Sequence, residues 1–171
     1  MLNEKMQKAL NEQINEELAS AYIYAAMANY FNETNLTGFA HWMRIQTDEE
    51  LDHARKFRDY LLDRGGKVLL TDIKAPQNEW AGPLAAFEMA YKHECHISEC
   101  INKLSSLAQD LRDHATHQFL EWFVAEQVEE EANADAVVQQ LKLVQDAPGG
   151  LFLLDREMAK RTEPDAGAGA Q

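Results

Sequence analysis

The chain has 171 residues, which is enough for one domain with a sizeable core. Its 29 acidic and 16 basic residues give a formal net charge of −13, which argues against a nucleic-acid partner and favours the attraction of cations. No run of 18 apolar residues occurs and the first residues lack the apolar stretch of a signal peptide, so we expect no membrane partner and a cytoplasmic location.

The first third of the chain predicts two helices. Residues 1–37 contain no glycine or proline, so a helix of about eight turns is expected over 3–31. A short polar turn at 32–35 implies that the next helix is antiparallel to the first. This second helix is expected over 37–64, and Gly65-Gly66 ends it.

An irregular segment follows. Residues 67–82 show no helical period, and Pro76, Gly82 and Pro83 interrupt any regular structure. A crossover of roughly 17 residues can span about 55 Å, more than the roughly 42 Å of a helix of about 28 residues. The segment can therefore return along the bundle, so that the helices before and after it run parallel.

The rest of the chain predicts three more helices. Pro83 suits the first position of a helix that runs to about residue 111, and after a break at 112–114 a fourth helix continues to about Val144. A short amphipathic helix is expected over 151–158. We therefore predict one all-α domain over residues 1–161, a four-helix bundle with a long crossover between the second and third helices and a short fifth helix, followed by a flexible tail over 162–171.

Each long helix has an apolar row that polar residues interrupt near its midpoint. The interrupting residues are Glu17, then Gln46, Glu50 and His53, then Glu94, then Gln127 and Glu130. The middle of a helix lies at mid-height whichever way the helix runs, so these groups should meet in one layer. Taken singly, each is common on ordinary helix surfaces, and only the coincidence of four interruptions indicates a site.

Such a layer of carboxylates requires cations. Like charges in a low dielectric repel strongly, and burying them without partners costs several kcal/mol. Two metal ions about 3.5–4 Å apart, bridged by a carboxylate, resolve this repulsion. Carboxylate oxygens with a single histidine suit iron or manganese and also accept zinc.

The spacing Glu17…Glu50-x-x-His53…Glu94…Gln127-x-x-Glu130 resembles that of the non-haem ferritins of bacteria and archaea. The likeness extends over nearly the whole chain and includes the stretches 91–94, 119–127 and 151–157. It implies a ferroxidase centre in which Glu17, Glu50 and His53 hold a first iron. In the same way it implies that Glu50 bridges to a second iron held by Glu94 and Glu130, with Gln127 close by.

The resemblance implies more than the paired site. A third iron would use Glu49, Glu126, Glu129 and Glu130, and Tyr24 would have a redox role. Trp122 could share that role or be an ordinary core aromatic residue. The substrates would be Fe(II) with O2 or H2O2. The assembly would be a homo-oligomeric cage of 24 subunits with the fifth helix at its four-fold contacts and His114, His117 and Glu121 near pores.

The chain differs at two positions from related families of di-iron proteins. Bacterioferritins bind haem through a methionine next to the histidine of their Glu-x-x-His motif, and this chain has Asp52 there, so we expect no haem. Glu130 stands where a second such histidine would be.

Three other functions stay open. A non-catalytic interaction bundle would have no reason to interrupt four apolar rows at one height. A metal buffer would keep the carboxylates but would not need Tyr24 or an open position for the oxidant. A di-iron oxygenase would need an apolar substrate pocket, whereas the stretch from Glu126 to Glu130 is acidic.

Overall fold

The structure is a computed structural model that describes residues 2–162. Within that range the chain forms no strand and five helices, which are α1 (Glu4–Glu33), α2 (Thr37–Asp63), α3 (Pro83–Asp110), α4 (His114–Val144) and α5 (Gly150–Met158). The all-α prediction is confirmed, and the predicted helix bounds are correct to within two residues. Apart from Thr162, the predicted tail lies outside the described residues. In the part described, no helix is both long enough and apolar enough to cross a membrane.

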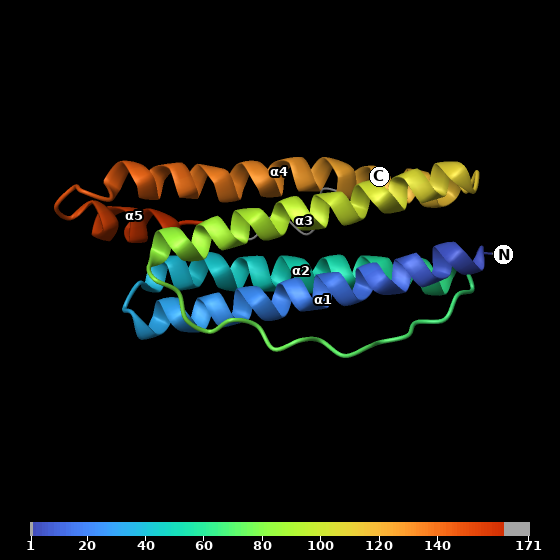
Figure 1. Cartoon of the computed structure of the whole chain (residues 1–171), viewed down its shortest axis with the longest axis horizontal. Helices are drawn as coiled ribbons and strands as arrows, with labels where there is room; N and C mark the ends of the chain where they lie inside the picture. Colours follow the sequence, from blue (N-terminus) through green and yellow to red (C-terminus); the bar gives the residue numbers. More distant parts are fainter. Residues whose placement is uncertain (1, 163–171) are drawn as a thin grey trace.

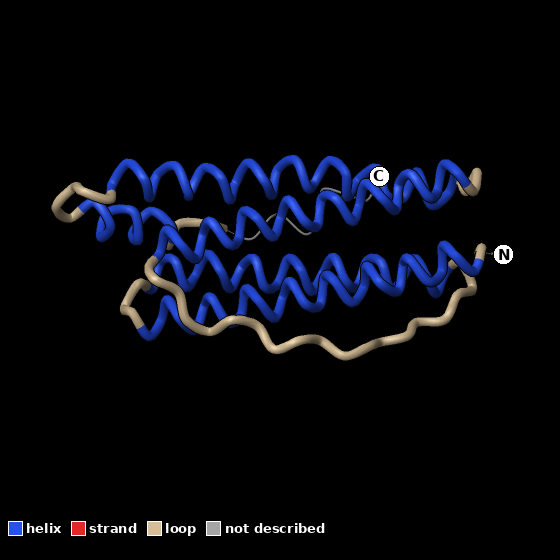
Figure 2. The backbone as a smooth tube through the Cα atoms, viewed as in Figure 1, coloured by secondary structure: helices blue, strands red, loops and turns tan. Residues whose placement is uncertain are grey.

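The four long helices pack side by side as two antiparallel pairs, α1 with α2 and α3 with α4 (Figure 1). Residues 64–82 return along the outside of the first pair (Figure 2), so α2 and α3 start at the same end of the bundle and run parallel, as predicted. Side chains of α1 hold the start of this crossover. The N–H of Lys67 donates to Oε1 of Gln7 at 2.9 Å, and Nδ2 of Asn11 donates to the Lys67 carbonyl at 3.0 Å.

The chain leaves α2 through a left-handed residue. Gly65 has φ 71°, and its N–H donates to the Leu62 carbonyl at 2.8 Å, while the N–H of Gly66 donates to the Leu61 carbonyl at 2.9 Å. These bonds satisfy carbonyls that the end of a helix leaves without a partner. The sequence prediction that Gly65-Gly66 ends this helix is therefore confirmed.

One carboxylate fixes α5 against the start of α2. The residue before α2, Leu36, provides no side-chain cap. Instead, Oδ1 of Asp155 on α5 accepts hydrogen bonds from the N–H groups of Gly38 at 2.8 Å and Phe39 at 3.0 Å. The backbones are so close that a Cβ atom on Gly38 would lie 1.7 Å from the Asp155 carbonyl oxygen. Gly38 and Asp155 together set the position of α5.

Two apolar clusters fill the bundle. One lies toward α5 and includes Phe31 and Phe87, and the other lies toward the opposite end and includes Leu10 and Phe57. Between them, all four long helices bury polar side chains near their midpoints. The predicted polar layer is therefore present, and it divides the core in two.

Candidate metal centre

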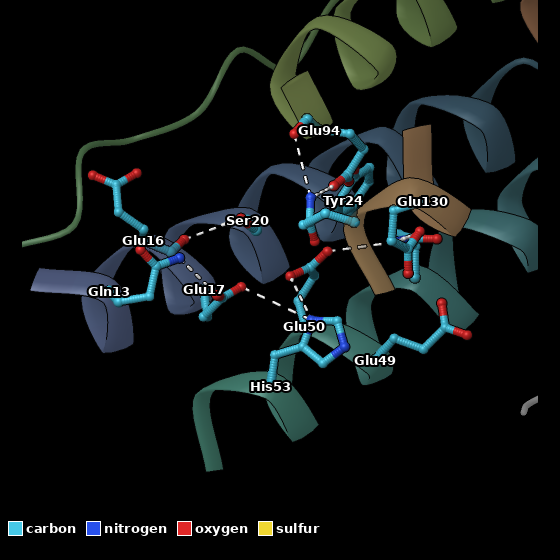
Figure 3. Close-up of polar contacts among 12 residues, drawn as sticks. Gln13, Glu16, Glu17, Ser20, Tyr24, Glu49, Glu50, His53, Glu94 and Glu130 are labelled. Carbon is cyan, nitrogen blue, oxygen red and sulfur yellow. Dashed lines mark hydrogen bonds and ion pairs between the residues drawn. The ribbon is translucent and has the colours of Figure 1, made fainter. Parts of the chain in front are cut away.

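Glu17 of α1 faces Glu50 and His53 of α2 across the first helix pair (Figure 3). All three side chains are buried, with exposed fractions of 1%, 2% and 4%. Nδ1 of His53 lies 3.5 Å from Oε2 of Glu50 and 3.9 Å from Oε2 of Glu17. One ligand atom from each residue lies within 4.8 Å of the other two, so the group could hold a metal ion.

Helical spacing and packing produce this arrangement. Glu50 and His53 are three residues apart, which places them on one face of α2 on neighbouring turns. The His53 ring stands edge-on to Trp122 and Phe123 of α4, with centroids 5.5 and 5.8 Å away. Nε2 of Gln13, one turn before Glu17 on α1, donates to Oε1 of Glu17 at 2.8 Å.

The two carboxylates each have an oxygen that the protein leaves without a partner. Oε2 of Glu17 and Oε2 of Glu50 are buried and have no hydrogen bond to any described residue. An unpaired buried carboxylate oxygen is costly. Burial, then the charge of Glu50, raises the pKa of Glu17 well above its ordinary value. Burial, then the charges of Glu94 and Glu130, does the same to the pKa of Glu50. A bound cation would relieve both effects, so the donor set fits a metal ion.

The second helix pair completes the layer with Glu94 of α3 and Gln127 and Glu130 of α4, all buried. The hydroxyl of Tyr24 donates to Oε1 of Glu94, and Nε2 of Gln127 lies 3.3 Å from Oε2 of Glu94. Burial, then the charge of Glu130, raises the pKa of Glu94 to about 7. The structure therefore brings together the six residues of the predicted paired site, with Tyr24 in contact with one of them.

Gln46 links the two halves of the layer. Its side chain is fully buried on α2, and Nε2 donates to Oε2 of Glu130 at 2.7 Å and lies 3.5 Å from Oε1 of Glu50. Carboxylates from α2 and α4 therefore share one amide.

The residues of the predicted third site lie at the edge of this layer. Glu49 and Glu126 are partly buried, whereas Glu129 is exposed. Burial, although the charge of Arg161 opposes it, raises the pKa of Glu49 to about 7. Burial also raises the pKa of Glu126. The guanidinium of Arg161 lies 2.6 Å from Oε2 of Glu49.

The remaining predicted residues lie further out. His114 and Glu121 are exposed on α4, and Nε2 of His117 lies 2.7 Å from Nε2 of Gln109. Trp122 is half-buried, with Nζ of Lys56 located 3.4 Å from its ring centroid. A pore role for the first group and a redox role for Trp122 stay predictions.

Sequence reasoning gave no role to three residues of the centre. Gln46 was visible as an interruption of the apolar row of α2, and Gln13 could have been found from its four-residue spacing to Glu17. No sequence signal indicates Arg161, because its position depends on the docking of α5.

The chain is similar to known proteins over most of its length. The model of the ferritin family, described as a ferritin-like domain, matches residues 7–144. The chain is 41% identical over 161 residues to a bacterial non-heme ferritin of Bacteroides fragilis, covering 94% of this chain and 100% of that protein. It is 39% identical over 162 residues to a bacterial non-heme ferritin of Staphylococcus saprophyticus, covering 95% of this chain and 97% of that protein.

The chain is also similar to solved structures of ferritins. An open pore ferritin from the archaeon Archaeoglobus fulgidus is 47% identical with a TM-score of 0.93, covering 95% of this chain and 100% of that one. An engineered closed form of the Archaeoglobus fulgidus ferritin is 46% identical with a TM-score of 0.94, covering 96% of this chain and 100% of that one.

Proposed function

The chain belongs to the ferritin family, and we propose that its buried centre oxidises Fe(II) to Fe(III), which is then stored as mineral inside an oligomeric cage. The two unpartnered oxygens of Glu17 and Glu50, which face the His53 ring, are the observation that best supports this proposal. Iron is the substrate here. Each Fe(II) ion loses one electron to O2 or H2O2.

We assign the first iron position to Glu17, Glu50 and His53. The second uses Glu94 and Glu130, with Glu50 as the bridge and Gln127 nearby. The hydrogen bonds among these side chains support the assignment of all four carboxylates as ligands, because each of them accepts a hydrogen bond that holds it in place. The holding pairs are Gln13 with Glu17, Gln46 with Glu50 and Glu130, and Tyr24 with Glu94.

The hydrogen bonds that these neighbours donate to the carboxylates have a chemical consequence. A carboxylate held by a hydrogen bond is oriented before a metal ion binds, so binding orders fewer side chains. The second oxygen has no hydrogen bond from the described part of the chain in Glu17 and Glu50, whereas in Glu94 it lies 3.3 Å from Nε2 of Gln127. Anionic oxygen ligands favour Fe(III) over Fe(II), since the ion of higher charge gains more from them. The protein therefore contributes orientation and charge. The contact of Tyr24 with Glu94 supports the redox role predicted for this tyrosine.

The acidic residues at the edge of the layer support a third iron position formed by Glu49, Glu126, Glu129 and Glu130. Burial raises the pKa of Glu126, and the charges of Glu130 and Glu129 add to this effect while those of His53 and Lys56 oppose it. Iron leaving the paired positions would pass through this cluster toward the mineral.

Storage requires many copies of the bundle. We propose a cage of 24 subunits, and exposed apolar side chains support it: Phe152 and Leu153 on α5 are 64% and 66% exposed, and Leu70 in the crossover is 68% exposed. The similar structures include an open pore form and an engineered closed form of one ferritin. The form of the cage, open or closed, is therefore to be measured separately from Fe(II) oxidation. The cytoplasmic location stays a prediction.

An aerobic Fe(II) titration tests the function. We expect rapid near-ultraviolet absorbance that saturates at about two or three irons per chain, the number of positions assigned. Stoichiometric binding without oxidation would instead favour a metal buffer, and no binding would remove the function. The di-iron oxygenase alternative would require turnover of an organic substrate, which the acidic surroundings of the centre do not favour.

A matched pair of variants localises the activity. Glu94→Ala should slow oxidation while the protein still assembles, because the cluster loses a ligand together with part of its repulsion. Glu99→Ala, an exposed position on the same helix, is the control. Size-exclusion chromatography reports assembly. Wild-type rates in Glu94→Ala would mean that the second iron position is assigned wrongly.

A further inference from the structure

Arg161 follows α5 and lies against α2, outside the residues that the ferritin family model matches. Its carbonyl oxygen is 2.9 Å from Nε2 of His41. Its guanidinium lies over the Trp42 ring, 4.2 Å from the ring centroid. The backbone and the head group of this residue are therefore both anchored, although no regular element contains it.

The docking of α5 explains how the residue comes to this place. Asp155 caps the first turn of α2, and Gly38 allows the two backbones to touch. Arg161, six residues after Asp155, then lies against the middle of α2. There Trp42, Gln46 and Glu49 form one stripe at helical spacing.

The guanidinium joins two residues of this stripe. Nη2 lies 2.6 Å from Oε2 of Glu49, and Nη1 donates to Oε1 of Gln46 at 2.8 Å. The side chains of Arg161 and Glu49 are only 17% and 13% exposed, so solvent screens the ion pair weakly. The planar guanidinium makes these two contacts with two different nitrogens, in a fixed geometry that the single nitrogen of a lysine does not reproduce.

The contact to Gln46 also determines which way that amide points. Arginine has only donors, so the atom of Gln46 that faces it must be the carbonyl oxygen. The amide nitrogen is then directed at Glu130, 2.7 Å away, and toward Glu50. Arg161 thus acts on Glu130 and Glu50 through Gln46 and does not contact either of these two carboxylates.

We propose that Arg161 is a built-in counter-cation of the centre, one that a metal ion must displace in order to bind at Glu49 and that fixes the orientation of Gln46 until it is displaced. The inference rests on the third iron position proposed above. A metal ion and a guanidinium on the same carboxylate repel each other, so the first cannot bind fully until the second moves. Arg161 therefore makes the third iron position, which we call the outer position, fill after the two paired positions.

The test is calorimetric titration of the full-length, metal-free protein with Zn²⁺, which binds carboxylate and histidine ligands without redox chemistry. In wild type we expect tight binding at the paired positions and weaker binding at the outer one. Arg161→Gln should tighten only the weak phase, by about tenfold, which corresponds to about 1.4 kcal/mol. Adding Glu49→Gln to that variant should abolish the gain.

Two further variants separate competition from loss of charge or of fold. Arg156→Gln removes the same charge from an exposed position on α5 and should leave every phase at its wild-type value. Arg161→Lys keeps a cation beside Glu49 and should restore weak outer binding. Size-exclusion chromatography confirms that each variant assembles.

Each outcome is decisive. If wild type binds Zn²⁺ and Arg161→Gln gives the same isotherm, or if Arg156→Gln tightens the weak phase equally, the inference is wrong while the proposed function stands. If no variant binds Zn²⁺, the proposed function and this inference both fail. A loss of tight binding in Arg161→Gln would assign the residue to the paired positions and overturn its role as a competitor.

Discussion

The hydroxyl of Tyr24 on α1 donates a hydrogen bond to Oε1 of Glu94 on α3. Neither side chain reaches solvent, since their exposed fractions are 0% and 1%. This bond joins the first and third helices at the height of the centre, next to the 2.7 Å contact between Oγ of Ser20 and Nε2 of His93. It connects the aromatic residue expected to exchange electrons with a carboxylate proposed to bind iron.

Replacing Tyr24 by phenylalanine should therefore slow Fe(II) oxidation by at least about tenfold, because a hydrogen bond to a charged group contributes about 1.5–3 kcal/mol and here orients Glu94. Stopped-flow absorbance in the first second after mixing would measure the rate. Tyr22→Phe is the control, because Tyr22 is 51% exposed on the same helix. Equal rates in the two variants would mean that the bond has no part in the reaction.

The close contact between α5 and α2 predicts that Gly38→Ala is strongly destabilising. The new methyl group would lie 1.7 Å from the Asp155 carbonyl oxygen, so α5 must move and its two capping hydrogen bonds are lost. We expect a loss of about 2 kcal/mol or more in the free energy of unfolding. Thermal denaturation measures this loss, and faster proteolytic cleavage around 146–150 would report the release of α5.

Gly82→Ala provides the matched control for that substitution. Gly82 also lies next to a helix start, but a Cβ atom there has no neighbour within 4 Å. Its denaturation temperature should stay close to that of wild type. If the two alanine variants proved equally stable, the backbone contact at Gly38 would not be what holds α5.

The sequence predicted the features that neighbouring residues determine, but not those that depend on contacts between helices far apart in the chain. The helices and the polar interruptions of their apolar rows follow from the helical period and from glycine and proline placement, which are local properties. The resemblance to the ferritins is what selected six of those residues as a paired site. The capping of α2 by Asp155 and the contact of Arg161 with Gln46 depend on where a separate helix docks. Nothing in the spacing of those residues indicates such a contact, so only the coordinates could reveal it.

Asp113 predicts a stability effect with a defined dependence on pH. Its carboxylate caps α4 by accepting from the Thr116 N–H at 3.2 Å, and it pairs with Arg64 at 3.1 Å. Although burial raises it, the hydrogen bonds from Arg64 and Thr116 bring the pKa of Asp113 below its ordinary value. Asp113→Ala should cost about 1–2 kcal/mol at neutral pH, the usual value of such a cap.

The sign of the pH effect follows from that lowered pKa. The stabilisation by Asp113 is complete above about pH 4, the ordinary pKa of aspartate, and is lost as the pH falls through the lower pKa of the folded state. The difference in urea midpoint between wild type and Asp113→Ala should therefore be constant from neutral pH to about 4. Asp72→Ala, exposed in the crossover, should show no difference. A difference that disappeared well above pH 4 would exclude Asp113 as its source.

Removal of metal gives a test of whether the carboxylates of the centre repel one another. Glu50→Gln keeps the shape of the side chain but removes the charge that adds to the repulsion felt by Glu17, so the metal-free variant should denature at a higher temperature than metal-free wild type. Wild type in Zn²⁺ at a hundred times its dissociation constant should gain about 2.7 kcal/mol, and the variant should gain far less. Glu12→Gln, exposed on α1, should behave as wild type in both conditions. If metal-free Glu50→Gln were instead less stable than Glu12→Gln, the carboxylates would be stabilising one another through a shared proton, and the centre would not need a cation to remain folded.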